Sequence, residues 1–408
     1  ASPLRTRFLE AVEGDLHGRH IESLAAYLET LELARASTDP WASVIAEVSI
    51  ASIVEYDDSV PNFVGQVQPV LQRLFEEPQG AGRVARYAAG NILIELAYRR
   101  GDMEAMNALR AAQGCISSFR VAGPFGPRQL LDFDRALAPE EPGPLGAEYD
   151  LGFGRGRRAT RDAEGRGCAV HLGNWPVGGA GTTYAEATIE VPTAGTHTIR
   201  LETPNAVELF VDDVSIARID RRTSAIGRTT FHALPLSAGS HRVMVKLGTR
   251  HPNPVLIAAV LDGEVRGDDV ELSTAEVRGP HPLAHYLDVT RSMSRADWVQ
   301  ARERLGPLDP TTASVMMLVL ATGVAMSDPL RGPDVARDDA QRAVSEARER
   351  DSHAWYPAIQ AARFESDNGR VREALALLRA GTNDFPDVLA FPLSLVDLLA
   401  ARGWNDQV

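Results

Sequence analysis

The chain has 408 residues, of which 44% are hydrophobic and 24% are charged, proportions that are typical of folded globular proteins. One hydrophobic core does not usually extend over this length, so we expect two to three domains. The net charge of −13 argues against nucleic-acid binding, because phosphate recognition requires a clustered excess of basic residues. No segment approaches the roughly 18 to 20 apolar residues that a membrane-spanning helix needs, and we expect no such span.

The only lysine among the 42 basic residues is Lys246. This arginine excess, with abundant alanine and glycine, indicates a GC-rich bacterial genome. The chain begins Ala1-Ser2-Pro3, without a methionine or an apolar signal region, which fits a targeting segment that was removed or never included. Cys115 and Cys168 permit one disulfide without requiring it. The compartment stays open, with the periplasm or cell envelope favoured over the cytoplasm.

Residues 1–117 have the pattern of a helical-repeat domain. Residues 84–111 are expected to form two helices separated by a tight turn at Arg100-Gly101-Asp102, where glycine suits the left-handed backbone that often ends a helix. Five apolar residues upstream fall on one continuous helical face. They are Ile21, Leu24, Ala25, Leu28 and Leu31.

Residues 118–275 are expected to form an antiparallel β-sandwich. Short segments of period-two alternation follow one another about every ten residues, with turn residues between them and no helical pattern. Residues 123–167 are mostly irregular in pattern and are expected to wrap around the sandwich. The predicted strands are 188–191, 197–201, 207–211, 229–234, 242–247 and 255–261.

Residues 276–408 return to a helical pattern, which repeats every 34 residues. Gly369 and Gly403 are 34 residues apart, and each lies at a predicted turn between helices. The order from Trp355 to Pro386 resembles a tetratricopeptide repeat, whose unit is a pair of antiparallel helices. Helices are therefore expected near 355–366, 371–380 and 389–400. The second helix of the last repeat has no room before residue 408, and we expect the native protein to continue.

The predicted sandwich also resembles a known family. The segments 119–125 (FRVAGPF), 184–187, 209–213 and 236–241 resemble the lectin-like, protective-antigen-type sandwich of multidomain bacterial proteins. In these proteins tetratricopeptide repeats flank the sandwich, and some continue into a transglutaminase-like cysteine-hydrolase domain. The fold class implied is a multidomain α and β protein, with tetratricopeptide-like helical repeats flanking an antiparallel β-sandwich.

Neither a metal nor a cofactor is expected. The calcium-dependent lectins of this family hold the ion with adjacent aspartates before a hairpin strand, where this chain instead has Thr203-Pro204-Asn205. Asp212-Asp213 falls in the turn after that strand, and turn chemistry alone favours aspartate there. Cys115 and Cys168 have no basic partner in sequence that would make either a nucleophile, so no catalytic residue is predicted.

Four residues are the candidates for contact with a ligand or partner. Trp175 stands beside a glycine-rich loop, where an exposed aromatic ring is able to stack on a sugar, although loop anchoring is an alternative role. Asn205 occupies the position that corresponds to the lectin site. Arg221 and Arg222 belong to a local basic group.

The leading hypothesis is a non-catalytic protein-interaction or scaffold module of a larger bacterial protein, because stacked helical repeats present continuous grooves to a partner. The first alternative is the accessory region of a transglutaminase-like cysteine hydrolase whose catalytic domain lies beyond residue 408. The second is a carbohydrate-binding module with a glycan ligand. In each case the partner remains unidentified.

Overall fold

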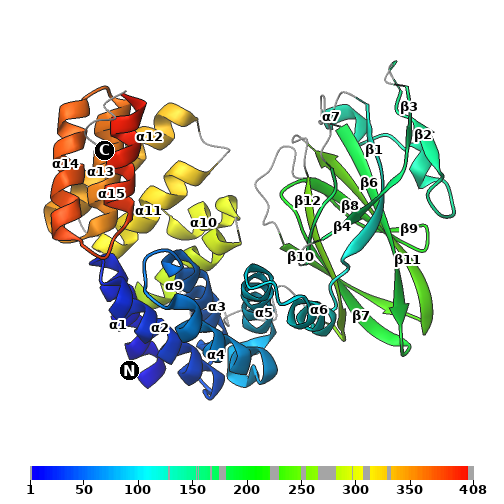
Figure 1. Ribbon diagram of the computed structural model, residues 1–408, viewed down its shortest axis with the longest axis horizontal. Coiled ribbons are helices and arrows are strands. Elements are labelled where there is room, and N and C mark those ends of the chain that lie inside the picture. Colours follow the sequence, from blue (N-terminus) through cyan, green and yellow to red (C-terminus); the bar gives the residue numbers. More distant parts are fainter. Residues whose placement is uncertain are drawn as a thin grey trace. The chain divides into compact units, whose positions relative to one another are not determined.

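The computed structural model describes residues 2–126, 129–152, 154, 156–165, 168–173, 181–220, 229–249, 254–264, 282–295, 297–306, 313–328 and 332–402. The chain forms two compact units (Figure 1). The helical unit combines residues 1–89 with residues 272–408, and the β unit contains residues 90–271. The sequence suggested three consecutive domains, 1–117, 118–275 and 276–408. The structure instead joins the first and last helical segments in one unit.

The helical unit takes its helices from both ends of the chain. Among its described residues, no helix is long and apolar enough to cross a lipid bilayer, and the same holds for the described part of the β unit. From the first segment come α1 (Pro3–Leu16), α2 (His20–Arg35), α3 (Ala42–Ile53), α4 (Phe63–Glu76) and the start of α5 (Gly82–Arg99). From the second come α9 (Pro282–Ser294), α10 (Trp298–Leu305), α11 (Val315–Ser327), α12 (Pro333–Arg350), α13 (Trp355–Asp367), α14 (Val371–Asp384) and α15 (Ala390–Ala401).

A buried ion pair joins the two segments of the helical unit. Glu47 on α3 accepts hydrogen bonds from Arg295 at 2.8 Å and from Arg291 at 3.3 Å, both belonging to the α9 region. Glu47 and Arg291 are each more than nine-tenths buried. Because these partners lie about 250 residues apart in sequence, no local pattern reveals the contact.

A second link between the segments surrounds Asp15 at the end of α1. Its backbone carbonyl accepts a hydrogen bond from the Trp355 indole at 2.7 Å, and its carboxylate accepts one from the Tyr56 hydroxyl at 2.7 Å. Burial raises the pKa of Asp15 to about 6, against the opposing effect of the Tyr56 hydrogen bond, although 39% of the side-chain surface stays accessible. Trp355 therefore packs and does not face solvent as a free contact residue.

The last helices of the unit follow the predicted spacing. α12 ends at Arg350 and α14 ends at Asp384, 34 residues later, while Gly369 takes the left-handed conformation (φ +77°) between α13 and α14. Gly381 lets α15 approach α14 closely, since a Cβ atom there would lie 2.1 Å from the Phe391 ring. Phe391 stacks on Phe385 with 5.4 Å between ring centroids. The predicted turn at Gly403 lies outside the described residues.

The β unit begins with a helical hairpin. α5 ends at Arg99, Gly101 provides the left-handed turn (φ +72°), and α6 spans Met103–Ala112. Asp102 caps α6 by accepting a hydrogen bond from the Ala105 amide at 3.0 Å. This confirms the helix, turn and helix predicted over residues 84–111.

Two antiparallel sheets form the body of the β unit (Figure 1). The six-stranded sheet has the order β4-β1-β6-β11-β8-β9, and the four-stranded sheet has the order β10-β7-β12-β5. A separate two-stranded ribbon pairs β2 with β3. The strands are β1 (Ser118–Phe125), β2 (Glu148–Asp150), β3 (Arg157–Ala159), β4 (Arg161–Glu164), β5 (Ala169–His171), β6 (Gly181–Val191), β7 (Gly195–Glu202), β8 (Ala206–Val211), β9 (Val214–Ile219), β10 (Thr229–Leu236), β11 (Gly239–Thr249) and β12 (Val255–Asp262).

The two sheets share one apolar core. Alternate residues of β6, β8 and β11 on one side, and of β7, β10 and β12 on the other, are buried against each other. Ala185, Val207 and Val245 face Ile199 and Leu256 across this core. The six predicted strands are confirmed, because an alternating segment buries an apolar face only as a strand.

The segment that follows β1 covers the outer face of the six-stranded sheet. Predicted to be mostly irregular, it contains a short helix, α7 (Gln129–Asp132), as well as β2, β3 and β4. A buried ion pair fastens it to the sheet, because the ammonium of Lys246 donates to Glu140 at 2.7 Å and to the Arg135 carbonyl at 2.9 Å. Tyr184 donates to the same Glu140 oxygen at 2.5 Å.

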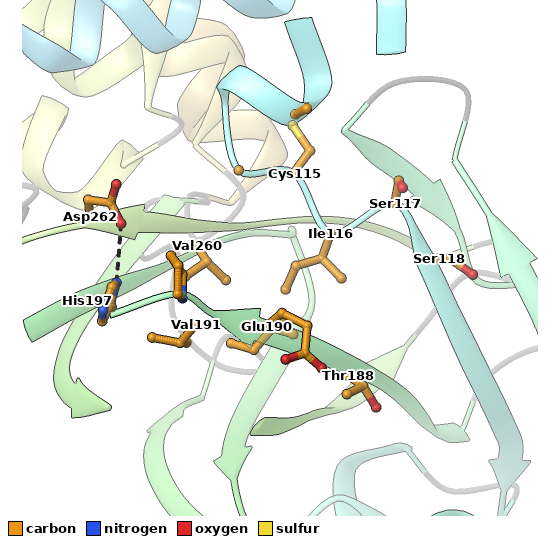
Figure 2. Close-up of a pocket in the computed structure, with 14 residues that line it drawn as sticks. Cys115, Ile116, Ser117, Ser118, Thr188, Glu190, Val191, His197, Val260 and Asp262 are labelled. Carbon is orange, nitrogen blue, oxygen red and sulfur yellow. Dashed lines mark ion pairs between the residues drawn. The ribbon is translucent and has the colours of Figure 1, made fainter. Parts of the chain in front are cut away.

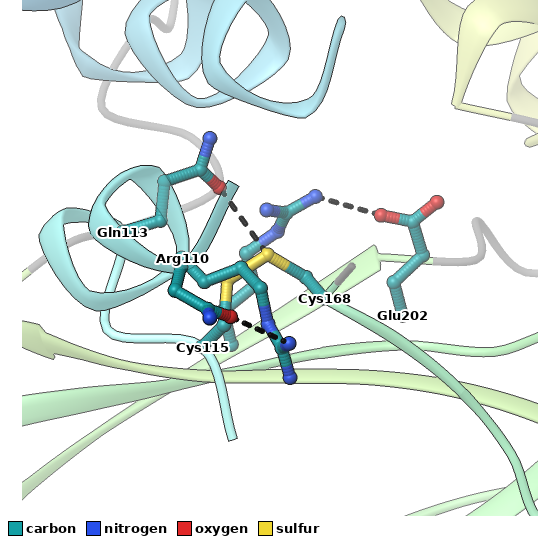
Figure 3. Close-up of a disulfide and its surroundings, with 7 residues drawn as sticks. Arg110, Gln113, Cys115, Cys168 and Glu202 are labelled. Atoms are coloured by element: carbon teal, nitrogen blue, oxygen red, sulfur yellow. Dashed lines mark hydrogen bonds and ion pairs between the residues drawn. A yellow bond between two sulfur atoms is a disulfide. The ribbon is translucent and has the colours of Figure 1, made fainter. Parts of the chain in front are cut away.

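A disulfide between Cys115 and Cys168 ties the end of the helical hairpin to the start of β5 (Figure 3). The two Cα atoms are 5.2 Å apart, and the bridge closes a loop of 53 residues. Cys168 packs with Ile94, Ala97 and Met106 of the hairpin. The disulfide therefore holds α5 and α6 against the sheets.

Candidate functional site

The candidate site of the β unit lies where the chain passes from one sheet to the other. Gly114 to Ile116 first runs along β12, with the Ile116 amide donating to the Ala258 carbonyl and the Val260 amide to the Gly114 carbonyl, both at 2.8 Å. A Cβ atom on Gly114 would lie 1.9 Å from the Val260 oxygen, and its φ of +67° favours glycine. The chain then enters β1, leaving a gap between the sheets beside it.

That gap is a cavity of about 410 Å³ (Figure 2). Its size falls within the range of small-molecule sites in proteins. Residues of β6 form one wall, residues of β7 and β12 form another, and the crossing chain closes the side. The polar side chains that line it are Ser117, Ser118, Thr188, Glu190, His197 and Asp262.

His197 is the buried polar group of this cavity. The imidazole, 4% exposed, donates from Nε2 to the Thr193 carbonyl at 3.0 Å. Its Nδ1 lies 3.4 Å from Oδ1 of Asp262 and makes no hydrogen bond, although it is shielded from solvent. The Asp262 side chain is 95% exposed. A carbonyl only accepts hydrogen bonds, so the neutral imidazole places its proton on Nε2 and leaves Nδ1 as an acceptor beside a carboxylate.

The arrangement suits binding better than nucleophilic catalysis. A serine nucleophile must lie within hydrogen-bond reach of its base. Ser117 and Ser118 instead lie at the opposite end of the cavity from His197 and Asp262, with Glu190 between them (Figure 2). The six polar side chains offer hydroxyl groups, carboxylates and an imidazole acceptor to a ligand, and the described lining contains no arginine or lysine.

The helical unit has a cavity of its own, also of about 410 Å³, which we call the α12–α14 groove. Ala358 of α13, Leu377 of α14 and Phe385 form its apolar part, and Arg348 and Asp384 stand at its charged edges. Ser345, Glu349, Ser352, Ala380 and Gly381 complete the lining. An apolar floor with a charged rim is the usual construction of a surface that binds a peptide.

Of the four residues predicted from sequence to contact a ligand, only Asn205 lies among the described residues. It is 8% exposed, and its side-chain amide donates to the Thr203 hydroxyl at 3.1 Å, so it stabilises the turn between β7 and β8. Trp175, Arg221 and Arg222 lie outside the described residues. Asn205 follows the end of β7, whereas His197 lies near its start, so the cavity is at the other end of the sheet.

Asp212 and Asp213 serve the hairpin between β8 and β9, as predicted. Both have positive φ values, +47° and +67°. Asp212 accepts from His241 at 2.6 Å and from the Arg242 amide at 2.9 Å; although burial alone acts in the other direction, these hydrogen bonds hold its pKa below the usual value. Among the described residues no group of three or more histidine, cysteine, aspartate or glutamate side chains is arranged to hold a metal ion.

Sequence reasoning missed His197 and Asp262 because no local motif contains them. They come together through the register of β7 and β12, in which His197 lies directly opposite Asp262. The alternation of β7 does place His197 on the same face as Ile199 and Leu201. A histidine on the apolar face of a predicted strand was therefore the one available signal.

No protein-family model matches the chain, and no curated protein matches it. Among solved structures, a beta-glucosidase from Kluyveromyces marxianus in complex with glucose is similar over 30% of this chain and 16% of its own, at 14% identity and a TM-score of 0.22. A GH31 alpha-xylosidase from Xanthomonas citri is similar over 38% of this chain and 14% of its own, at 15% identity and a TM-score of 0.22. The chain thus spans 16% or less of these proteins, and the likeness carries no argument about function.

Proposed function

We propose that this chain is a non-catalytic interaction module that binds a protein partner through its helical unit. The observation that carries this proposal is the α12–α14 groove. Its walls are helices that follow one another at the 34-residue spacing expected of tetratricopeptide-like repeats, an architecture whose stacked helices form continuous binding surfaces. An extended peptide is the ligand class that fits such a groove.

The groove is built on rigid elements, which favours recognition by a preformed surface. Ile359 and Leu378 are buried beneath it, and Phe385 is held by the stacked Phe391 ring. A peptide that places an apolar side chain against Leu377 and Phe385 would gain from apolar burial, at about 25 cal/mol per Å². The charged edges at Arg348 and Asp384 would then set its orientation.

Selection of peptides from a random library on the immobilised full chain tests this proposal. Ala380→Arg fills the groove with a long charged side chain, whereas Ala376→Arg makes the same change one turn earlier on α14, outside the groove lining. Both alanines are exposed, and arginine keeps a high helix propensity, so both variants should fold. We expect selected peptides to lose binding to Ala380→Arg and to retain it with Ala376→Arg. Peptides that bind all three proteins equally, or the failure to select any, would contradict the proposal.

A further inference from the structure

We propose that the cavity between the two sheets of the β unit binds a cationic side chain, the guanidinium or ammonium group of an arginine or lysine on a partner protein. The assignment rests on the proposed interaction function for its protein partner. The cavity belongs to the β unit alone, however, and a small probe tests it without reference to the α12–α14 groove.

The first argument is the unused acceptor on His197. Nε2 is committed to the Thr193 carbonyl, and Nδ1 is buried without a hydrogen bond. A buried polar atom without a partner costs free energy, which a ligand that donates to it would recover. In the neutral imidazole this atom accepts, so the ligand must bring an N–H or O–H group.

The second argument is the carboxylate beside that acceptor. Asp262 Oδ1 is 3.4 Å from Nδ1, so one planar group with two N–H donors is able to reach both. Guanidinium groups bind carboxylates through two parallel N–H bonds, and such charge-assisted bonds are stronger than neutral ones. Glu190 adds a second negative charge to the same cavity.

The third argument is the character of the remaining lining. Its hydroxyl groups, on Ser117, Ser118 and Thr188, both donate and accept, and its apolar surface comes from aliphatic side chains such as Ile189 and Val260. The described lining contains no aromatic ring, the group on which sugar rings commonly stack. An aliphatic wall that leads to an acidic end matches the alkyl stem and charged head of arginine or lysine.

Titration of the full chain with N-acetyl-arginine amide tests the proposal, with N-acetyl-citrulline amide as the uncharged isostere. Binding is measured by calorimetry and by the ¹⁵N and ¹H shifts of the His197 imidazole. We expect the arginine amide to bind about tenfold more tightly than the citrulline amide, a ratio that corresponds to the loss of one charge-assisted hydrogen bond. It should move the His197 resonances, and rising salt should weaken it.

Asp262→Asn should weaken binding of the arginine amide about tenfold. Since Asp262 is exposed, the variant should fold. The control, Glu141→Gln, removes the same charge at an exposed position outside the cavity lining and should leave binding unchanged. Equal binding of both amides, or no effect of Asp262→Asn, would overturn the proposal. So would a His197 Nδ1 that carries its own proton toward Asp262 in the free protein, or a methyl glucoside that moves the same resonances while the arginine amide does not.

Discussion

Replacing Lys246 with methionine should destabilise the β unit, because it removes the ammonium from a buried ion pair. Lys246 is 1% exposed and donates to Glu140 and to the Arg135 carbonyl. Removal of one partner from a buried pair costs about 3–5 kcal/mol of folding free energy. Glu140 keeps its hydrogen bond from Tyr184, and 16% of its side chain is exposed, so we expect about 2–3 kcal/mol.

The double variant Lys246→Met with Glu140→Gln should be more stable than Lys246→Met alone, because it leaves no unpaired charge in the protein interior. Lys246→Arg should also be destabilising, by about 1–3 kcal/mol, since the ammonium lies near the Phe133 and Tyr184 rings (5.5 and 5.8 Å from their centroids), where a planar guanidinium is larger.

Native-state hydrogen exchange is the suitable assay, because the chain has two units and overall unfolding need not be two-state. The free energy of opening is measured for the amides of β11 and β6, the strands that carry Lys246 and Tyr184. A loss of less than about 1 kcal/mol in Lys246→Met would refute the view that the pair fastens the covering segment to the sheet.

Three further predictions concern the other links of the fold. Folding of the helical unit binds a proton to Asp15 more tightly than the unfolded chain does, so its stability should fall as the pH rises from about 4 to about 6, and denaturant titrations of Asp15→Asn should lack this slope. Glu47→Ala leaves Arg291 buried without its carboxylate and should lower the unfolding midpoint of the helical unit, whereas an unchanged midpoint would dissociate α3 from α9. Reduction of the Cys115–Cys168 disulfide should cost about 2–4 kcal/mol, measured as a shift in thermal unfolding that a Cys115→Ser variant no longer shows.

The elements that sequence predicted well are those with a strong local pattern. The helices α5 and α6, the turn at Gly101 and the inner strands of both sheets bury one face with regular spacing, which neighbouring residues reveal. The strand β9 was missed because both of its faces are largely exposed, with Val214 60% and Ile216 38% accessible. Such an edge strand has no apolar alternation to detect.

The features that sequence did not predict depend on partners far apart in the chain. Glu140 and Lys246 are separated by 106 residues, and Glu47 and Arg295 by 248. His197 and Asp262 meet through strand register alone. The composition did contain one signal, because a chain that uses arginine almost throughout retains its only lysine where a compact ammonium is nearly fully buried.

Hydrogen exchange of the full chain with and without a selected peptide tests the proposed interaction function most directly, because it locates the binding surface. The account predicts slower exchange in the lining of the α12–α14 groove, at residues 345–352 and 377–385, and unchanged exchange in α1 and α2. The same peptide should give no protection in the Ala380→Arg variant. Protection that avoids the groove and falls on other helices would contradict the account.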